Sequence, residues 1–275
     1  MMRVKIARFK DGPMIRKEWG ITGPFFVDSK EISCCKLISH PECVELRLWI
    51  PPHEGAVSKC IRIVGYLKED MALFLTDDEN GKLLLEKIMS PLEEEKNMMD
   101  ILGLLFQELL SKERELLERK ESSLSERELL LLEGRTYEFW KWDMEVRREI
   151  LDLREYYQEL ADVIGEMQSI TESRDSLEGY RIKCEKLERR TDNLLNQMEL
   201  IRETYRAIVV ERQNKNMNTL TVASMFFLPL NVITGWFGMN FHNMPELEHG
   251  YPYVAAVCVL LILLIFWFFK KNRFL

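Results

Sequence analysis

Proline, glycine and acidic residues are missing from long parts of this sequence, and each absence limits what the chain can be. No proline occurs between Pro91 and Pro229, and glycine is sparse there. Both residues disfavour helix interiors, so their scarcity in a segment rich in Glu, Lys, Arg and Leu predicts long helices. From residue 219 onward there is no acid except Glu246 and Glu248. The chain therefore combines a charged body with an apolar tail.

The sequence also lacks the motifs of common enzymes. It has no glycine-rich phosphate loop and no nucleophile elbow, and its four histidines show no catalytic spacing. The formal net charge is −7. An acidic chain is unsuited to nucleic acid, which proteins bind mainly by neutralising phosphates with Lys and Arg. We therefore expect neither an enzyme nor a nucleic-acid-binding protein, whereas an acidic body is compatible with the attraction of cations.

Six cysteines are scattered along the chain, and one of them lies inside an apolar stretch. The first residues do not resemble a secretory signal, so we expect a cytosolic body with reduced thiols. Cys34, Cys35, His40 and Cys43 are close together in sequence. Their spacing matches no standard zinc finger, which disfavours a zinc site at this place.

Residues 1–90 predict a cytosolic α/β domain. Apolar and polar residues alternate over 44–50 and stop at Pro51, which is the pattern of a half-buried strand. Acidic and small residues at 77–81 predict a turn. The expected strands are 4–6, 44–50, 61–64 and 72–75, followed by a helix at 83–89.

Residues 91–218 predict a bundle of long helices that ends in a stalk. Ser122, Ser123 and Ser125 predict a turn between two helices, and Ser125 with Glu128 fits a capping box. A second break is expected between 170 and 176. After it, apolar residues recur at alternating spacings of three and four, as in a heptad seam that packs against another helix. The seam consists of Leu177, Tyr180, Cys184, Leu187, Thr191, Leu194, Met198, Ile201, Tyr205 and Ile208. No breaker separates it from the tail, so we expect one helix from 177 to about 237.

Residues 219–275 predict a transmembrane domain. The segments 219–237 and 253–269 are uncharged and long enough to cross a bilayer, the second only just. The loop 238–252 between them has no Lys or Arg, whereas basic residues precede the first span and follow the second. The positive-inside rule therefore places both termini in the cytosol and the loop outside. Two spans cannot enclose a pore, so transport would require several copies of the chain.

Polar side chains share one face of the first span. Steps of three and four residues along the helix connect Asn214, Met217, Thr221, Ser224, Leu228, Asn231 and Gly235, which we call the polar stripe. Polar groups are costly in lipid, so the stripe should face water or protein. It can line a pore, or it can be a packing face, because small and polar residues also join membrane helices. The second span has no such stripe, as expected of an outer helix that faces lipid.

The neutrality of the stripe is suited to a hydrated ion. Mg²⁺ gives up its water reluctantly, and amide and hydroxyl oxygens can accept hydrogen bonds from that water without holding the ion too tightly. Met217 and Leu228 would interrupt these oxygens with apolar collars, which can close a pore by dewetting.

The end of the first span resembles the CorA family of magnesium transporters. Gly238-Met239-Asn240 follows the span, and Met244-Pro245-Glu246-Leu247 follows in the loop. These motifs, Pro229-Leu230 within the span, the two-span C-terminus and the basic ending are similar to the family pattern. Phe237 and Asn231 depart from it, because the family usually has tyrosine and threonine there.

The resemblance implies an α+β membrane protein that forms a funnel-shaped homopentamer in the cytoplasmic membrane. Gly238, Met239 and Asn240 would form the selectivity filter, and the polar stripe would line the pore. Glu246 and Glu248 in the outer loop would concentrate cations. Cytosolic Mg²⁺ would regulate the pore, and acids that could bind it are Asp175, Glu178, Asp77 and Asp78.

We therefore expect a transporter for divalent cations, Mg²⁺ first, with no cofactor beyond the transported and regulatory ion. Two alternatives stay open. One is a transporter of Zn²⁺ or of Co²⁺ and Ni²⁺ with the same architecture. The other is a membrane-anchored coiled-coil scaffold that conducts nothing, which would explain the heptads and the tail but not the Gly-Met-Asn motif.

Overall fold

The computed structural model describes residues 3–20, 29–52, 60–68, 71–89, 97–171, 174–238 and 247–271. The chain forms two compact units, Met1–Arg202 and Glu203–Leu275. The first contains the sheet and the helices around it. The second contains the rest of the long helix and the helix that follows it.

A five-stranded sheet with the order β1-β5-β4-β3-β2 organises the first unit. Its strands are β1 (Arg3–Ala7), β2 (Lys36–Ser39), β3 (Val44–Ile50), β4 (Ile61–Lys68) and β5 (Met71–Leu75). β1 runs parallel to β5, and the other neighbours are antiparallel. Strands at the four predicted places are confirmed, whereas β2 was not predicted. β4 continues four residues beyond the predicted segment, because β3 pairs with it as far as Leu67 and β5 as far as Lys68.

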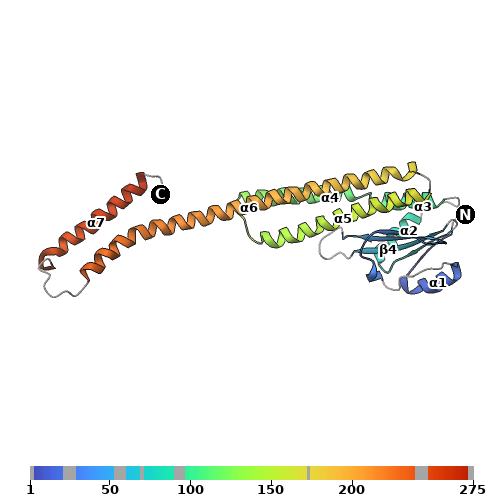
Figure 1. Ribbon diagram of the computed structural model, residues 1–275, viewed down its shortest axis with the longest axis horizontal. Helices are drawn as coiled ribbons and strands as arrows, with labels where there is room; N and C mark the ends of the chain where they lie inside the picture. The colour runs from blue at the N-terminus through green and yellow to red at the C-terminus, as the bar shows by residue number, and fades with distance from the viewer. Residues whose placement is uncertain are drawn as a thin grey trace. The chain divides into compact units, whose positions relative to one another are not determined.

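Both faces of the sheet are covered, which explains why β5 is apolar at every position. Leu73 and Leu75 pack on one face with Phe9 and Ile15. Ala72 and Phe74 point to the other face and are also buried. Figure 1 shows α1 (Gly12–Trp19) and α5 (Phe139–Thr171) on opposite sides of the sheet. The single-turn helices η1 (Phe9–Asp11) and η2 (Ser29–Glu31) complete the layer of α1.

Long helices make up the rest of the first unit. They are α2 (Glu79–Met89), α3 (Met98–Leu109), α4 (Glu113–Leu132), α5, and α6 (Arg174–Phe237) up to Arg202. The seam of α6 is buried at Leu177, Cys184, Leu187, Thr191, Leu194, Met198 and Ile201. Ion pairs join α4 to α5 through Lys120 and Glu149, and α5 to α6 through Arg154 and Asp192. The partners of the seam therefore lie in the same chain.

The predicted turn at the serines is wrong, because α4 continues through them. Ser122 Oγ donates to the Glu118 carbonyl at 3.0 Å, and Ser125 Oγ donates to that of Glu121 at 3.1 Å. A serine that bonds back to the carbonyl four residues earlier is compatible with a helix interior. The helix ends instead near Gly134, whose φ of 82° few other residues adopt readily. The capping box at Ser125 is wrong for the same reason.

The second predicted break is confirmed, since α5 ends at Thr171 and α6 begins at Arg174. The continuous helix to Phe237 is confirmed as well. The turn at 77–81 is only partly correct, because α2 already begins at Glu79. The Asp78 carboxylate accepts a hydrogen bond from the Asn80 N–H at 3.2 Å and so caps this helix.

The second unit contains α6 beyond Arg202 and α7 (Leu247–Lys271). Among the described residues, α6 is the one helix that is long and apolar enough to cross a membrane. The described apolar part of α7, Ala255–Trp267, is shorter. Pro229 lies inside α6 and removes the usual helical donor to the Met225 carbonyl.

The buried thiols give a test of the core. Burial raises the pKa of Cys184 to about 12, and it raises the pKa of Cys35 further still. Because the thiolate is the reactive form, both should resist iodoacetamide in the folded protein at pH 8, whereas the half-exposed Cys34 and Cys60 should react. Mass spectrometry of the alkylated peptides measures this. Alkylation of Cys184 as fast as that of Cys60 would contradict the packing described here.

Candidate functional site

The polar stripe lies on the part of α6 that belongs to the second unit. All seven of its residues are exposed in the single chain, and Met217 and Leu228 expose 65% and 66% of their surface. Exposed methionine and leucine side chains at the same spacing as Asn, Thr and Ser form one continuous face. The chain itself therefore leaves the whole stripe uncovered.

The covered face of α6 lies on the other side of the helix. The half-buried residues of the expected first span are Val222, Ala223, Phe226, Pro229, Leu230 and Ile233. At about 100° per residue, their mean direction lies about half a turn from that of the polar stripe. The predicted stripe is thus the side of the helix that contacts within the chain leave free. This side is therefore available to water, lipid or another copy of the chain.

A threonine hydroxyl in the stripe is oriented by the helix itself. Thr221 Oγ1 donates to the Met217 carbonyl at 2.8 Å. Thr219 and Thr234 make the same bond to the carbonyls four residues before them, both at 2.9 Å. A hydroxyl whose hydrogen is used in this way keeps its oxygen lone pairs as acceptors. The water molecules bound to a cation donate hydrogen bonds outward, so they require acceptors of this kind.

Gly238 has a local reason to be glycine. Its N–H donates to the Thr234 carbonyl at 2.9 Å as α6 ends. A Cβ at this position would lie 2.9 Å from that same carbonyl oxygen, closer than real Cβ atoms approach. Met239, Asn240 and Glu246 lie outside the described residues, and so does the side chain of Glu248 at the start of α7. The filter and the outer loop stay predictions.

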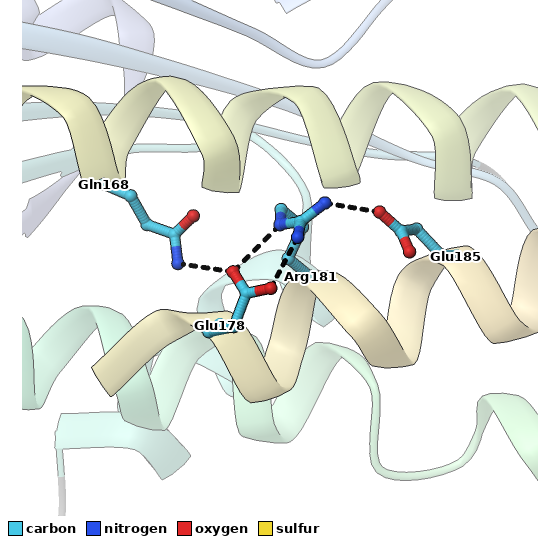
Figure 2. A network of polar contacts seen from close by, with 4 residues as sticks. All are labelled: Gln168, Glu178, Arg181 and Glu185. Atoms are coloured by element: carbon cyan, nitrogen blue, oxygen red, sulfur yellow. Dashed lines mark hydrogen bonds and ion pairs between the residues drawn. The ribbon is translucent and has the colours of Figure 1, made fainter. Parts of the chain in front are cut away.

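Glu178, one of the predicted regulatory acids, is held by a network of polar contacts (Figure 2). Arg181 donates through Nη2 to Glu178 Oε1 at 2.5 Å and through Nε to Oε2 at 3.0 Å. Gln168 of α5 donates to the same Oε2 at 3.2 Å, and Arg181 also reaches Glu185. The bond from Arg181, then that from Gln168, lowers the pKa of Glu178. A cation at Glu178 would have to displace Arg181.

Asp77 and Asp78 hold backbone at the start of α2. Asp77 accepts a hydrogen bond from the Phe9 N–H at 3.2 Å, and Asp78 caps the helix. The side chain of Asp175 lies outside the described residues. Among described residues, no three His, Cys, Asp or Glu side chains are grouped so that they could hold a metal ion. A regulatory metal site therefore stays a prediction.

Two of the clustered residues considered for a zinc site, Cys35 and His40, make contacts with other parts of the first unit. His40 Nε2 lies 2.8 Å from Glu45 Oε2, and Arg47 Nε donates to Glu45 Oε1 at 2.6 Å. The Cys35 thiol donates to the Trp49 carbonyl at 3.3 Å. These bonds stabilise the edge of the sheet, because the Glu45 carboxylate is fully buried.

Sequence reasoning missed an ion pair at the end of the first unit. Arg202 Nη2 donates to Asp143 Oδ2 at 2.7 Å, with side-chain exposures of 15% and 2%. The partners are 59 residues apart, so no short spacing reveals them. Arg147 and Glu199 form a second pair beside it. Together these pairs fix the beginning of α5 against α6.

Removing the buried acid tests this contact. Asp143→Ala should lower the free energy of unfolding by about 3–5 kcal/mol, because it leaves Arg202 without its buried partner. Asp192→Ala is the matched control, since its pair with Arg154 is more than 40% exposed on both sides. That change should cost at most about 1 kcal/mol. Denaturant unfolding of the full chain in detergent measures both free energies. An equal loss in the two variants would show that the Asp143–Arg202 pair contributes no more than an exposed ion pair.

The chain thus combines an α/β domain with one continuous helix that leads into an apolar helical end. A family model described as "CorA-like Mg2+ transporter protein" matches residues 47–271. The chain therefore belongs to the family of CorA-like Mg²⁺ transporters, and the family resemblance predicted from the sequence is confirmed. Because the family consists of transporters, the chain belongs to no class of enzymes.

Curated relatives match mainly over part of their length. A putative metal ion transporter, YfjQ of Bacillus subtilis, is 40% identical over 77 residues, 27% of this chain and 24% of its own. The cobalt/magnesium transport protein CorA of Thermotoga maritima is 39% identical over 75 residues, 26% and 21% of the two chains. The magnesium transport protein CorA of Helicobacter pylori is 28% identical over 205 residues, 69% and 63%. The matched part thus spans less than a quarter of the first two relatives.

Solved structures confirm the fold. The CorA magnesium transporter from Methanocaldococcus jannaschii has a TM-score of 0.72 at 18% identity, over 99% of this chain and 90% of that one. The full-length CmaX protein has a TM-score of 0.69 at 15% identity, over 98% and 87%. The ZntB cytoplasmic domain from Vibrio parahaemolyticus has a TM-score of 0.61 at 9% identity, over 77% and 89%. The predicted α/β domain with a long helix is therefore confirmed.

Proposed function

We propose that this protein carries divalent cations, most readily Mg²⁺, across the cytoplasmic membrane into the cell. The observation that supports this best is the exposed polar stripe on the side of α6 that the chain itself leaves uncovered. Curated relatives with related sequences are named as magnesium or cobalt/magnesium transport proteins. The segments 219–237 and 253–269 would span the membrane, with both termini in the cytosol.

Oligomerisation completes the proposed pathway. Two helices of one chain cannot surround a channel for a hydrated ion, so the stripes of several copies must face one another. A homopentamer, as the family resemblance implies, would place five stripes around a common axis. The half-buried face with Val222, Phe226 and Ile233, which other parts of the same chain contact, would then point away from that axis.

The chemistry of the stripe suits a cation that keeps its water. Asn214, Thr221 and Asn231 offer neutral oxygens, which accept hydrogen bonds from bound water but attract the ion weakly enough to release it. Met217 and Leu228 would form apolar rings between them, at which water is least stable. Gly238, Met239 and Asn240 would select the ion at the outer end, where Glu246 and Glu248 raise the local cation concentration.

Cytosolic Mg²⁺ is proposed to regulate the pathway through acids of the first unit. Asp175, whose side chain lies outside the described residues, stays a candidate, whereas Arg181 already neutralises Glu178. Asp77 and Asp78 hold backbone groups and would have to give up these bonds to bind an ion.

The filter can be tested in liposomes that contain a Mg²⁺-sensitive dye. The wild-type protein should admit Mg²⁺ rapidly, and Asn240→Ala should reduce the rate to near that of empty liposomes, because the ion loses its outer oxygen ring. Asn216→Ala is the control, since Asn216 is exposed on α6 but lies outside the stripe. A wild-type protein that is folded and oligomeric but admits only Zn²⁺ or Co²⁺ would identify a different cation. One that admits none would favour the scaffold.

The apolar ring proposed at Leu228 can be tested by shortening this side chain. Leu228→Ala should make the pore leakier, because a wider and less apolar ring holds water more readily. Leu230→Ala makes the same chemical change on the half-buried side of α6 and should leave the leak unchanged. The measurement is Mg²⁺ flux at high internal Mg²⁺, where the wild-type pore should be closed. Equal leaks in the two variants would exclude Leu228 as a gate.

A further inference from the structure

We propose that an acidic face of α5 in one copy of the chain docks on a basic surface at the N-terminal end of a second copy. The acidic face consists of Glu145, Glu149, Asp152, Glu155, Glu159, Asp162 and Glu166. The basic surface consists of Arg3, Lys5, Arg8 and Lys10. The proposal rests on the oligomerisation in the proposed function but not on transport, and the proposed cation pathway uses none of these residues.

The acidic face is regular, and none of its side chains is fully buried. Its seven members follow one another at steps of three or four residues, which places them on one side of the helix. Like charges at this spacing repel one another and destabilise a helix. A row of carboxylates of this kind is stabilised when a cationic surface lies against it.

The chain itself neutralises little of this charge. Glu149 pairs with Lys120 of α4. Glu159 accepts a hydrogen bond from the Cys35 N–H at 2.7 Å. The other five carboxylates form no hydrogen bond or ion pair with the part of the chain that the structure describes. Most of the acidic face is therefore available to a cationic partner.

Repulsion between the carboxylates contributes to the pKa of Glu159. Burial raises this pKa, and the neighbouring Glu155 and Asp162 raise it as well, whereas the hydrogen bond from Cys35 lowers it. A cation beside these carboxylates would favour their charged forms and offset the repulsion. A basic surface of another copy would supply that cation.

The basic surface contrasts with the charge of the whole chain. Residues 3–17 contain six basic residues and one acid, although the formal net charge of the chain is −7. The side chains of Arg3, Arg8 and Lys10 are exposed, and they form no hydrogen bond or ion pair with the described residues. This surface therefore suits an acidic partner.

The two surfaces cannot meet within one chain. Lys5 lies opposite Leu73 in the pairing of β1 with β5. Leu73 is buried with Phe9 and Ile15, in the layer of α1. Because paired residues of neighbouring strands point to the same side of a sheet, Arg3 and Lys5 point to the side that carries α1. α5 covers the other side (Figure 1), so contact between the surfaces requires two copies.

The two surfaces also match in length. Arg3 and Arg8 are five residues apart in extended chain, which corresponds to about 17 Å. Asp152 and Asp162 are ten residues apart on a helix, which corresponds to about 15 Å. A strand edge and a helix of these lengths can lie side by side with several opposite charges within reach of one another.

A contact between two different surfaces can continue from copy to copy around a ring. Each copy then presents its acidic face to one neighbour and its basic surface to the other. Exposed ion pairs add little to the strength of such a contact, but complementary charges fix its register and disfavour wrong arrangements. The charges therefore decide which surfaces meet when copies assemble.

Zero-length cross-linking of the full-length oligomer in detergent tests the proposal. A carbodiimide joins a lysine amine to a carboxylate only where the two groups are in contact. At low salt it should link Lys5 or Lys10 to carboxylates of the acidic face, and mass spectrometry of the digested protein identifies the linked peptides. High salt should reduce these links, because it screens exposed charges. The pair of Lys120 and Glu149 within one chain is the control and should be linked under both conditions.

Exchange of the charges gives a second measurement. R8E/K10E and D152K/D162K, made separately, should each raise the concentration at which the oligomer dissociates by about threefold or more, as measured by light scattering. All four changes in one chain should restore most of the wild-type value, because opposite charges meet again. Lys36→Glu is the control, since Lys36 is exposed on β2 at the opposite edge of the sheet and should leave the value unchanged.

The outcomes separate the docking from the proposed function. An oligomer that yields the Lys120–Glu149 link but no link between the two surfaces would mean that copies meet elsewhere, and only the docking would be wrong. A protein that is folded but monomeric would overturn both the docking and the oligomeric pathway. Links that persist unchanged at high salt, or charge reversals that the combined variant does not rescue, would show that charge does not select the contact and would overturn the proposal.

Discussion

The buried seam on the first part of α6 is the contact on which the rest of the structure depends. From Leu177 to Ile201 its side chains pack at spacings of three and four, which fixes the rotation of the helix about its own axis in the first unit. The helix continues without a break to Phe237, so the same spacing decides which residues share a face further along. One helix thus presents an apolar seam where it meets its own chain and a polar stripe where that chain leaves it uncovered.

The polar groups of this structure fall into two kinds. Buried acids such as Glu45 and Asp143 are held by an arginine or a histidine, and they stabilise the first unit. The stripe is different, because Asn214, Thr221 and Asn231 are exposed and neutral. An exposed neutral oxygen contributes little to folding, which fits a function in contact with something outside the chain. Glu178 shows how the first kind can resemble a metal ligand in the sequence while an arginine already neutralises it.

Regular patterns made the long elements predictable, and contacts distant in sequence made the others unpredictable. The heptads of α6 and the alternation in β3 follow from burial on one side, so periodicity revealed both. The serines of α4 misled because each hydroxyl can bond its own helix as easily as it can end one. The Asp143–Arg202 pair had no local signal. The stripe was visible as a pattern, but its purpose depends on neighbours that one chain does not contain.

Accessibility of introduced cysteines tests the central claim most directly, in the full chain with Cys34, Cys60 and Cys258 replaced by serine. If the stripe lines an aqueous pathway, Ser224→Cys should react with a membrane-impermeant thiol reagent, and Mg²⁺ should slow that reaction. Phe226→Cys, on the half-buried face, should not react. Equal protection of both positions from the reagent, in a protein shown to be inserted and oligomeric, would mean that the stripe is a packing face and that the pathway lies elsewhere.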